Sequence, residues 1–363
     1  MSNVLDTELY LYRDRNGLYL RGAADALKYR NMFRRLKRVV LGCFVGLLLV
    51  YIGAALFSAR LALYPWWYKS EFVGKELPPC SSYQSRVYVH CQNPNTNLGV
   101  QYSMFESEKK VDGKLVRVSG WWIKPRKLEA QKGIVILVHG GGADRRAMLK
   151  HAGYLTSAGY HALLIDCHNH GLNQSDGTGI SLGLWESESV VVAAEWAAPR
   201  IRRLNAAGKV ESLPIIAMGT SMGAFSALRA AWRSNLIRAV VAENSYVSVR
   251  ELLYEFPMLT WMPRAVKAGA MVLISGWLGH SVWQLDVRKF GELMGPRPVL
   301  LIHGEQDGVT TLHHSEDILD AISGPKALWR VPRGEHEQLW NLMRDEYEKK
   351  ILVFLDGVSQ AAF

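Results

Sequence analysis

The chain has 363 residues, of which 49% are hydrophobic and 21% are charged. This composition excludes a disordered or collagen-like chain, and four cysteines are too few for a disulfide scaffold of this size. The formal net charge of +10 is typical of proteins that bind nucleic acid or an anionic membrane surface, so the position of the charge decides between these two classes.

The excess positive charge is concentrated at the start of the chain. Residues 1–38 contain nine Lys and Arg residues against four Asp and Glu residues. Nineteen uncharged residues follow directly, from Val39 to Phe57, and as a helix they would be about 28 Å long, close to the hydrocarbon core of a bilayer. An interfacial aromatic belt is expected next, formed by Tyr64, Trp66, Trp67 and Tyr68. The pattern favours a membrane anchor over nucleic-acid binding.

Basic residues beside a membrane span stay in the cytoplasm. We therefore expect a single-pass membrane protein with a cytoplasmic basic segment (1–38), a transmembrane anchor (39–58) and a juxtamembrane linker (59–82). The rest of the chain would lie outside the cytoplasm, in a lumen, in a periplasm or at the cell exterior. A cleaved signal peptide is one alternative, weakened by the long leading segment and a poor cleavage site near Ser58. A buried soluble helix is the other, weakened by the lack of a polar stripe.

Two short patterns depend on this orientation. Cys80 and Cys91 would lie in a compartment that permits disulfides, and both a disulfide and two free thiols remain open. The glycosylation sequon at residues 173–175 would matter only in a eukaryotic lumen.

Residues 83–357 are expected to form one α/β domain. Short β-rich runs come first, at 86–91, 100–105 and 115–123. Continuous apolar runs, typical of parallel strands buried on both faces, then lie at 134–138, 161–165, 215–218, 239–242 and 299–302. Helical segments alternate with them, at 144–158, 184–198 and 337–355. The expected fold class is α/β, with a mostly parallel, doubly wound sheet covered by helices on both faces.

Residues 244–295 interrupt this alternation and are rich in aromatic side chains. Within them, Ala268–Gly279 is nearly all apolar but too short to cross a bilayer. This stretch is interpreted either as a buried helix or as a surface that faces lipid or an acyl chain. We expect a helical lid insertion over about residues 244–295.

The sequence Gly219-Thr220-Ser221-Met222-Gly223 matches G-x-S-x-G. The pentad alone is a weak signal, but an apolar strand precedes it and a helical segment follows it, as in a nucleophile elbow. The small residues allow a strained turn that would expose the hydroxyl of Ser221. The alternative is a glycine turn in which Ser221 only caps the helix.

His139-Gly140-Gly141-Gly142 directly follows the strand expected at 134–138. Consecutive glycines let the backbone approach a substrate oxygen and offer N–H donors to it. The expected oxyanion hole consists of the backbone amides of Gly141 and Met222. A nucleotide-binding loop is disfavoured, because neither G-x-G-x-x-G nor G-K-[ST] is present.

A nucleophilic serine needs a base, and the base needs an orienting acid. His336 lies between an expected strand and the last helix, and Asp307 follows the strand at 299–302. Both lie at carboxyl ends of parallel strands, the sheet edge where α/β sites form. The predicted triad is Ser221, Asp307 and His336, and Glu243 is an alternative acid.

The other histidines are weaker candidates. His139 and His303 end strands and are expected to make structural hydrogen bonds, whereas His313 and His314 begin a helix. The sequence contains no H-E-x-x-H motif and no Cys/His cluster, so neither a metal nor another cofactor is expected.

Taken together, these motifs resemble the α/β-hydrolase superfamily across about residues 85–355. The segments that carry the resemblance are HGGG, GTSMG, HGEQDGVT and GEH. The order of anchor and hydrolase resembles single-pass membrane-anchored serine hydrolases, which include monoacylglycerol and lysophospholipid lipases. One loop departs from the superfamily pattern Asp-x-Arg-Gly-x-Gly-x-Ser: residues 166–175 lack the arginine and are longer. In the superfamily this loop helps to shape the substrate pocket.

These observations predict a serine esterase that cleaves lipid acyl esters through an acyl-enzyme intermediate. The expected partners are a small ester or lipid substrate and the bilayer, with no nucleic acid. A thioesterase and a serine peptidase are rival enzymes with the same triad, and a non-catalytic membrane scaffold is the rival outside enzymes.

Overall fold

The computed structural model describes residues 10–14, 17–21, 23–68, 102–173, 176–204, 210–336 and 338–360. The chain divides into two compact units, Met1–Leu56 and Phe57–Phe363, which are taken one at a time. The strand expected at 86–91, together with Cys80 and Cys91, lies outside the described residues.

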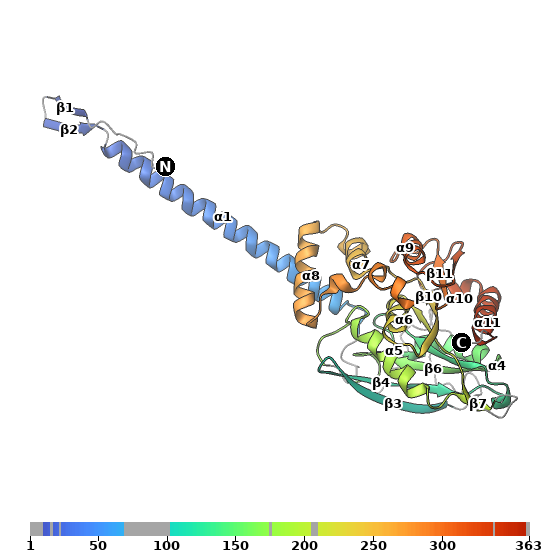
Figure 1. Cartoon of the computed structure of the whole chain (residues 1–363). Coiled ribbons are helices and arrows are strands. Elements are labelled where there is room, and N and C mark those ends of the chain that lie inside the picture. The colour runs from blue at the N-terminus through green and yellow to red at the C-terminus, as the bar shows by residue number, and fades with distance from the viewer. Residues whose placement is uncertain are drawn as a thin grey trace. The chain divides into compact units, whose positions relative to one another are not determined.

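The first unit contains an antiparallel pair of strands, β1 (Tyr10–Asp14) and β2 (Gly17–Arg21), and most of the long helix α1 (Ala23–Leu63) (Figure 1). Within α1, Arg30–Leu63 is long and apolar enough to cross a membrane. Most of the large apolar side chains of this stretch are exposed. Because a core helix of a soluble protein would have them covered, the exposure argues against a buried soluble helix.

The second unit is built on an eight-stranded sheet in the order β12-β11-β10-β9-β5-β6-β4-β3. Strands β5 to β12 of this sheet pair in parallel, whereas β4 is antiparallel to both β6 and β3. The strands are β3 (Tyr102–Val111), β4 (Lys114–Ile123), β5 (Gly133–Val138), β6 (Tyr160–Asp166), β9 (Ile215–Thr220), β10 (Ile237–Glu243), β11 (Val299–Gly304) and β12 (Lys326–Val331).

Helices cover both faces of the sheet (Figure 1). On one face, α4 (Leu149–Ser157) and α11 (Arg344–Gln360) pack into a core with side chains such as Val135 and Leu137 of β5. On the other face, α5 (Leu184–Ala197) packs against α6 (Met222–Arg233). The central strands are apolar along their length because both of their faces are buried. The expected doubly wound α/β fold is confirmed.

Two helical expectations differ from the structure in detail, and one pair of strands is additional. The segment expected as one helix at 144–158 begins as a 3₁₀ turn, η3 (Arg145–Met148), before α4. The closing segment is split into α10 (Leu339–Leu342) and α11. A small pair of strands that the sequence did not suggest, β7 (Arg202–Leu204) and β8 (Val210–Ser212), follows α5.

The insertion after β10 contains α7 (Val249–Glu255), α8 (Arg264–Leu278) and four short 3₁₀ turns. One face of α8 buries Val266, Met271 and Ile274, while Val272 and Trp277 on its other face are 61% and 60% exposed. The expected buried helix is therefore confirmed for one face of α8, and the other face is exposed.

The register of the parallel strands brings their carboxyl ends to one edge of the sheet. Val138 of β5 pairs with Gly219 of β9, and Gly219 pairs with Ala242 of β10. The next residue of β10, Glu243, pairs with Ile302 of β11. The loops that follow these four strands are therefore neighbours, and they carry most of the residues singled out in the sequence.

Candidate active site

Ser221 lies in the sharp turn between β9 and α6. Its backbone has φ 54° and ψ −120°, a conformation that is costly for a residue other than glycine. Two glycines make the turn possible: a Cβ on Gly219 would lie 2.3 Å from the carbonyl of Gly223, and a Cβ on Gly223 would lie 2.3 Å from the carbonyl oxygen of Val138. The local sequence thus dictates a strand, a strained turn and a helix around this hydroxyl.

The structure brings the three residues of the predicted triad together. The Nε2 atom of His336 lies 2.9 Å from the Oγ of Ser221, and its Nδ1 lies 2.7 Å from Oδ2 of Asp307. His336 comes from the loop after β12 and Asp307 from the loop after β11. The imidazole therefore bridges a hydroxyl and a carboxylate that are 86 residues apart in the chain.

Backbone and side-chain donors hold the carboxylate of Asp307. The amides of Val309 and Thr310 donate to Oδ1 at 2.8 and 2.9 Å, and the hydroxyl of Thr310 lies 3.0 Å from Oδ2. Burial alone would raise the pKa of Asp307, but the hydrogen bond and charge of His336 and the two amides outweigh it and keep this pKa below its usual value. The carboxylate is thus ionised and fixed in orientation.

Asn244 connects the loops that carry the histidine and the acid. Its side-chain amide donates to the carbonyl oxygens of His336 and Glu335 at 2.6 and 3.2 Å, and its Oδ1 accepts from the amide of Gly304 at 2.9 Å. Its own carbonyl lies 3.0 Å from the hydroxyl of Thr310. The residue is fully buried at the end of β10 and has φ 49°, a conformation that asparagine tolerates. Sequence reasoning missed this residue.

The loop after β5 lies beside the candidate nucleophile. A Cβ on Gly140 would come within 3.7 Å of the Ser221 Cβ, and a Cβ on Gly141 would come within 3.6 Å of the Met222 Sδ. Met222 is the first residue of α6, so its amide is one of the helix N–H groups that have no partner within the helix. The two amides expected to form the oxyanion hole therefore come from neighbouring backbone segments.

The weaker candidates have other partners. The carboxylate of Glu243 accepts from the hydroxyls of Thr220 and Tyr347, and Glu243 is not the acid that contacts His336. The Nε2 of His139 accepts from the amide of Cys167 at 3.1 Å, and both ring nitrogens of His303 are hydrogen bonded. Burial lowers the pKa of both histidines, which favours neutral, structural rings.

The loop after β6 departs from the superfamily pattern. The carboxylate of Asp166, at the start of this loop, is paired with an arginine from η3. The buried carboxylate of Asp166 pairs with the guanidinium of Arg145 in η3 at 2.6 Å and also accepts from the amide of Leu172 at 2.9 Å. The side-chain amide of Asn173 donates to the carbonyls of Asp166 and Cys167. Asn173 is buried, so the sequon it begins is a poor acceptor for a glycan.

Residues just after the long helix contact the glycine-rich loop. A Cβ on Gly142 would lie only 2.7 Å from the Trp67 ring, and Trp67 also packs on Phe256 of the insertion at 5.7 Å between ring centroids. The hydroxyl of Tyr68 donates to the carbonyl of Asn169 at 2.6 Å. The expected aromatic belt is therefore divided: Tyr68 is buried here, whereas the neighbouring Trp66 is 71% exposed.

Residues 129–290 match a family model described as serine aminopeptidase, S33. The chain is 25% identical to the uncharacterized protein YqkD of Bacillus subtilis over 234 residues, which are 62% of this chain and 72% of that protein. It is also 25% identical to the uncharacterized protein YfhR of Escherichia coli over 248 residues, 66% of this chain and 76% of that protein.

Solved structures share the architecture at low identity. An esterase of Pyrococcus furiosus aligns with a TM-score of 0.55 and 18% identity, over 78% of this chain and 97% of the esterase. An acylaminoacyl peptidase of Pyrococcus horikoshii aligns with a TM-score of 0.52 and 16% identity, over 76% of this chain and 43% of the peptidase. At these identities the likeness establishes the fold, and this chain has the α/β-hydrolase fold.

Proposed function

We propose that the protein is a membrane-anchored serine hydrolase that cleaves carboxylic esters, with acyl esters of lipids as its substrates. The observation that carries the proposal is the hydrogen-bonded series from the Ser221 hydroxyl through His336 to Asp307, with distances of 2.9 and 2.7 Å. This is the arrangement that makes a serine nucleophilic at neutral pH.

In the proposed reaction, the Oγ of Ser221 attacks the ester carbonyl while Nε2 of His336 takes the hydroxyl proton. Asp307 holds the imidazole in the tautomer that presents an unprotonated Nε2, and it stabilises the imidazolium that forms. His336 then returns the proton to the leaving alcohol. Water, deprotonated by the same imidazole, hydrolyses the acyl-enzyme and frees the serine. No cofactor takes part in these steps.

The negative charge on the carbonyl oxygen needs donors that are fixed in advance. We assign this role to the amides of Gly141 and Met222, whose neighbouring positions support it. Removing one such donor typically raises the barrier by ~3 kcal/mol. The strained turn at Ser221 supports this assignment of the oxyanion hole, because the turn holds the hydroxyl beside the first amides of α6.

The lipid preference rests on exposed apolar side chains in the insertion, which we propose is a lid. Trp261 is 72% exposed, and it is accompanied by Met258, Val272, Trp277 and Trp283. Side chains of this size are seldom left in water without a partner surface. The insertion also contacts the end of the apolar helix and the residues after it: the hydroxyl of Ser58, in the last turns of α1, contacts the sulfur of Met262, and Trp67 packs on Phe256. A bilayer is the partner that fits this continuity.

We further propose that residues 39–58 anchor the protein, with residues 1–38 in the cytoplasm and the hydrolase domain on the other side. The basic residues before the apolar stretch support this orientation. Protease protection on sealed membranes tests it: the domain should resist protease added from the cytoplasmic side. Digestion from that side would contradict the orientation.

Labelling with a fluorophosphonate probe tests the assigned nucleophile. The full chain in detergent should be labelled, and Ser221→Ala should lose labelling and ester turnover. Ser323→Ala, an exposed serine in the loop before β12, is the matched control and should keep both. Equal labelling of Ser221→Ala and the control would contradict the assignment.

A peptidase is the second candidate, because the matched family model is described as an aminopeptidase. Matched ester, thioester and amide substrates with one acyl group would separate the alternatives. The proposal expects the highest kcat/KM on the ester with a long acyl chain. Preferred cleavage of the amide would favour the peptidase, and no turnover of any substrate would favour a scaffold.

A further inference from the structure

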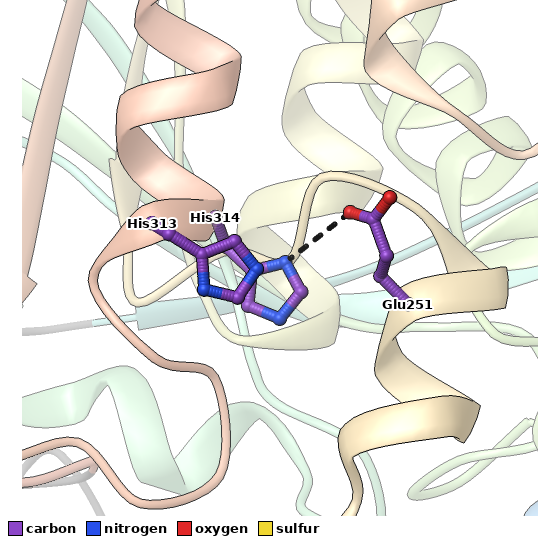
Figure 2. Close-up of side chains that lie close together, drawn as sticks. All are labelled: Glu251, His313 and His314. Atoms are coloured by element: carbon purple, nitrogen blue, oxygen red, sulfur yellow. Dashed lines mark ion pairs between the residues drawn. The ribbon is translucent and has the colours of Figure 1, made fainter.

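A second cluster of ionisable side chains lies where the insertion meets the domain. His313 and His314 begin α9 (His313–Ala321), and Glu251 and Glu255 lie one turn apart on α7. Figure 2 shows the two imidazoles facing the carboxylate of Glu251. We propose that this cluster binds a divalent transition metal of the zinc class. The inference is independent of the function proposed for Ser221.

The atoms are close enough for one ion. A carboxylate oxygen of Glu251 and one ring nitrogen from each histidine lie within 4.8 Å of one another. The two rings are stacked, with centroids 4.3 Å apart. Zinc ligands lie about 2.0–2.2 Å from the ion, so ligand atoms about 3.3–4 Å apart surround it. Small rotations of the side chains would bring the three atoms to these separations.

The carboxylate of Glu255 determines which nitrogen of each imidazole is available to bind a metal. The two oxygens of Glu255 each lie 3.4 Å from an Nε2 atom, one of His313 and the other of His314. Metal-bound histidines commonly direct their other N–H at a carboxylate in this way. The Nδ1 atoms are then the ligands. Nδ1 of His314 lies 4.0 Å from Oε2 of Glu251, and Nδ1 of His313 would exchange its 2.7 Å contact with the Thr311 hydroxyl for the ion. The other contact of the His314 Nδ1 is a long hydrogen bond, 3.3 Å, from the amide of Val247.

Two atoms of the cluster are left without hydrogen bonds. Among the described residues, Oε2 of Glu251 and Nε2 of His314 are buried atoms that have no hydrogen-bond partner. The side chain of His314 is fully buried. Buried polar atoms are normally satisfied, so such orphans call for an explanation. A metal would bind the first atom directly, and the second lies 3.4 Å from Oε2 of Glu255, the carboxylate at which it would direct its N–H.

The charge around the cluster favours a cation. Arg288 pairs with Glu251 at 2.7 Å and also with Asp286 and Asp317, so one guanidinium serves three carboxylates. Glu255 adds a fourth.

The donor types select the metal class. Two imidazoles and a carboxylate suit zinc and neighbouring transition metals, whereas calcium and magnesium prefer sites made of oxygen. The ion would fasten α7 of the insertion to α9, three residues beyond Thr310, which contacts Asp307. Its role would be structural, and no substrate contact is implied.

Metal content and thermal stability test the proposal on the full chain in detergent, purified without a histidine tag. After treatment with a chelator and return of Zn²⁺, the protein should bind one equivalent and unfold at a higher temperature. Glu251→Gln and His313→Gln each remove one ligand and should weaken Zn²⁺ binding at least tenfold. Both variants should fold, because both side chains are partly exposed.

Glu316→Gln, an exposed carboxylate on the same helix, and His280→Gln are the matched controls and should bind zinc as the parent does. Stoichiometry well below one in the parent, or equal binding by Glu251→Gln and the controls, would overturn the proposal. Neither readout depends on ester turnover, so failure here leaves the assignment of Ser221 untouched.

Discussion

The side-chain amide of Asn244 donates a hydrogen bond to the backbone carbonyl of His336 at 2.6 Å. The same side chain accepts from the amide of Gly304, at the end of the strand that precedes Asp307. One buried asparagine therefore sets the separation between the loops of the proposed base and its acid. We assign it as a positioning residue.

Asn244→Asp keeps the size of the side chain and tolerates the positive φ, but it replaces the donor with an acceptor that faces two carbonyls. Loss of such a buried hydrogen bond costs about 1–3 kcal/mol. We expect kcat on a soluble ester to fall roughly 10- to 100-fold with little change in KM. Asn235→Asp, an exposed asparagine beside Arg297, is the control. A loss of folding without a specific loss in kcat would reduce Asn244 to a purely structural role.

Thr310→Val tests the support of the acid. The valine has nearly the same shape, but it lacks the hydroxyl that lies 3.0 Å from Oδ2 of Asp307. Two amide donors remain on the other oxygen, so the carboxylate should stay ionised yet turn more freely. The expected loss is about 1 kcal/mol, or roughly fivefold in kcat, measured at a pH where the parent is fully active. An unchanged kcat would show that the amides alone are sufficient.

Gly223→Ala tests the close approach at the elbow. The added Cβ would lie 2.3 Å from the carbonyl oxygen of Val138, which is backbone and cannot rotate away. We expect a loss of about 3 kcal/mol or more in the free energy of unfolding, together with loss of activity. Gly357→Ala in α11 is the matched control, because no atom lies within 4 Å of its Cβ position; it should be neutral or more stable by up to ~1 kcal/mol. Urea denaturation of both variants decides.

The adjacent tryptophans after the long helix form a natural pair. Trp67 contacts Gly142 and Phe256, whereas Trp66 is largely exposed. In detergent, Trp67→Ala should raise KM for a long-chain ester roughly tenfold or more, because it loosens the glycine-rich loop, and Trp66→Ala should not. Equal KM values for the two variants would show that the contacts of Trp67 do not affect substrate binding.

Buried histidines predict the response of stability to acid. Burial lowers the pKa of His161 and of His170 to about 4, with smaller contributions from Lys124 and His139 respectively. Between pH 6.5 and about 4 the unfolded chain therefore binds more protons than the native one. The stabilisation should be complete above pH 6.5 and should fall as the pH drops toward 4.

Urea midpoints measured between pH 7 and pH 4.5 check this expectation. Replacing His161 by asparagine should make the pH dependence shallower by up to one proton. A parent protein whose midpoint rises on acidification would contradict the neutral state of these rings.

The strands and the candidate site were readable from the sequence for a physical reason. Strands buried on both faces must be apolar along their whole length, so β5, β6, β9, β10 and β11 stand out. Because their carboxyl ends share an edge, residues that directly follow them, such as Ser221 and Asp307, were expected to meet. The resemblance to known hydrolases added the order of the motifs.

The residues that sequence reasoning missed act through contacts that leave no local pattern. Asn244 is one polar residue in an ordinary loop, and its importance depends on backbone groups about 60 and 92 residues away. Likewise, Trp67 and Tyr68 were assigned to a membrane interface from their composition, but they pack against the glycine-rich and neighbouring loops. The pairing of Glu251 with His313 and His314 likewise depends on the tertiary arrangement of two helices.

The outermost strand of the sheet, β3, has consequences beyond the site. Among the residues that the structure describes it pairs only with β4, and Glu106, Glu108, Lys109 and Lys110 along it are exposed. Charged side chains on an open edge discourage strand-to-strand association between copies. Held in a membrane by the proposed anchor, the protein would meet its copies at high local density and in a restricted set of orientations. This strand would then keep crowded neighbours from fusing their sheets into aggregates.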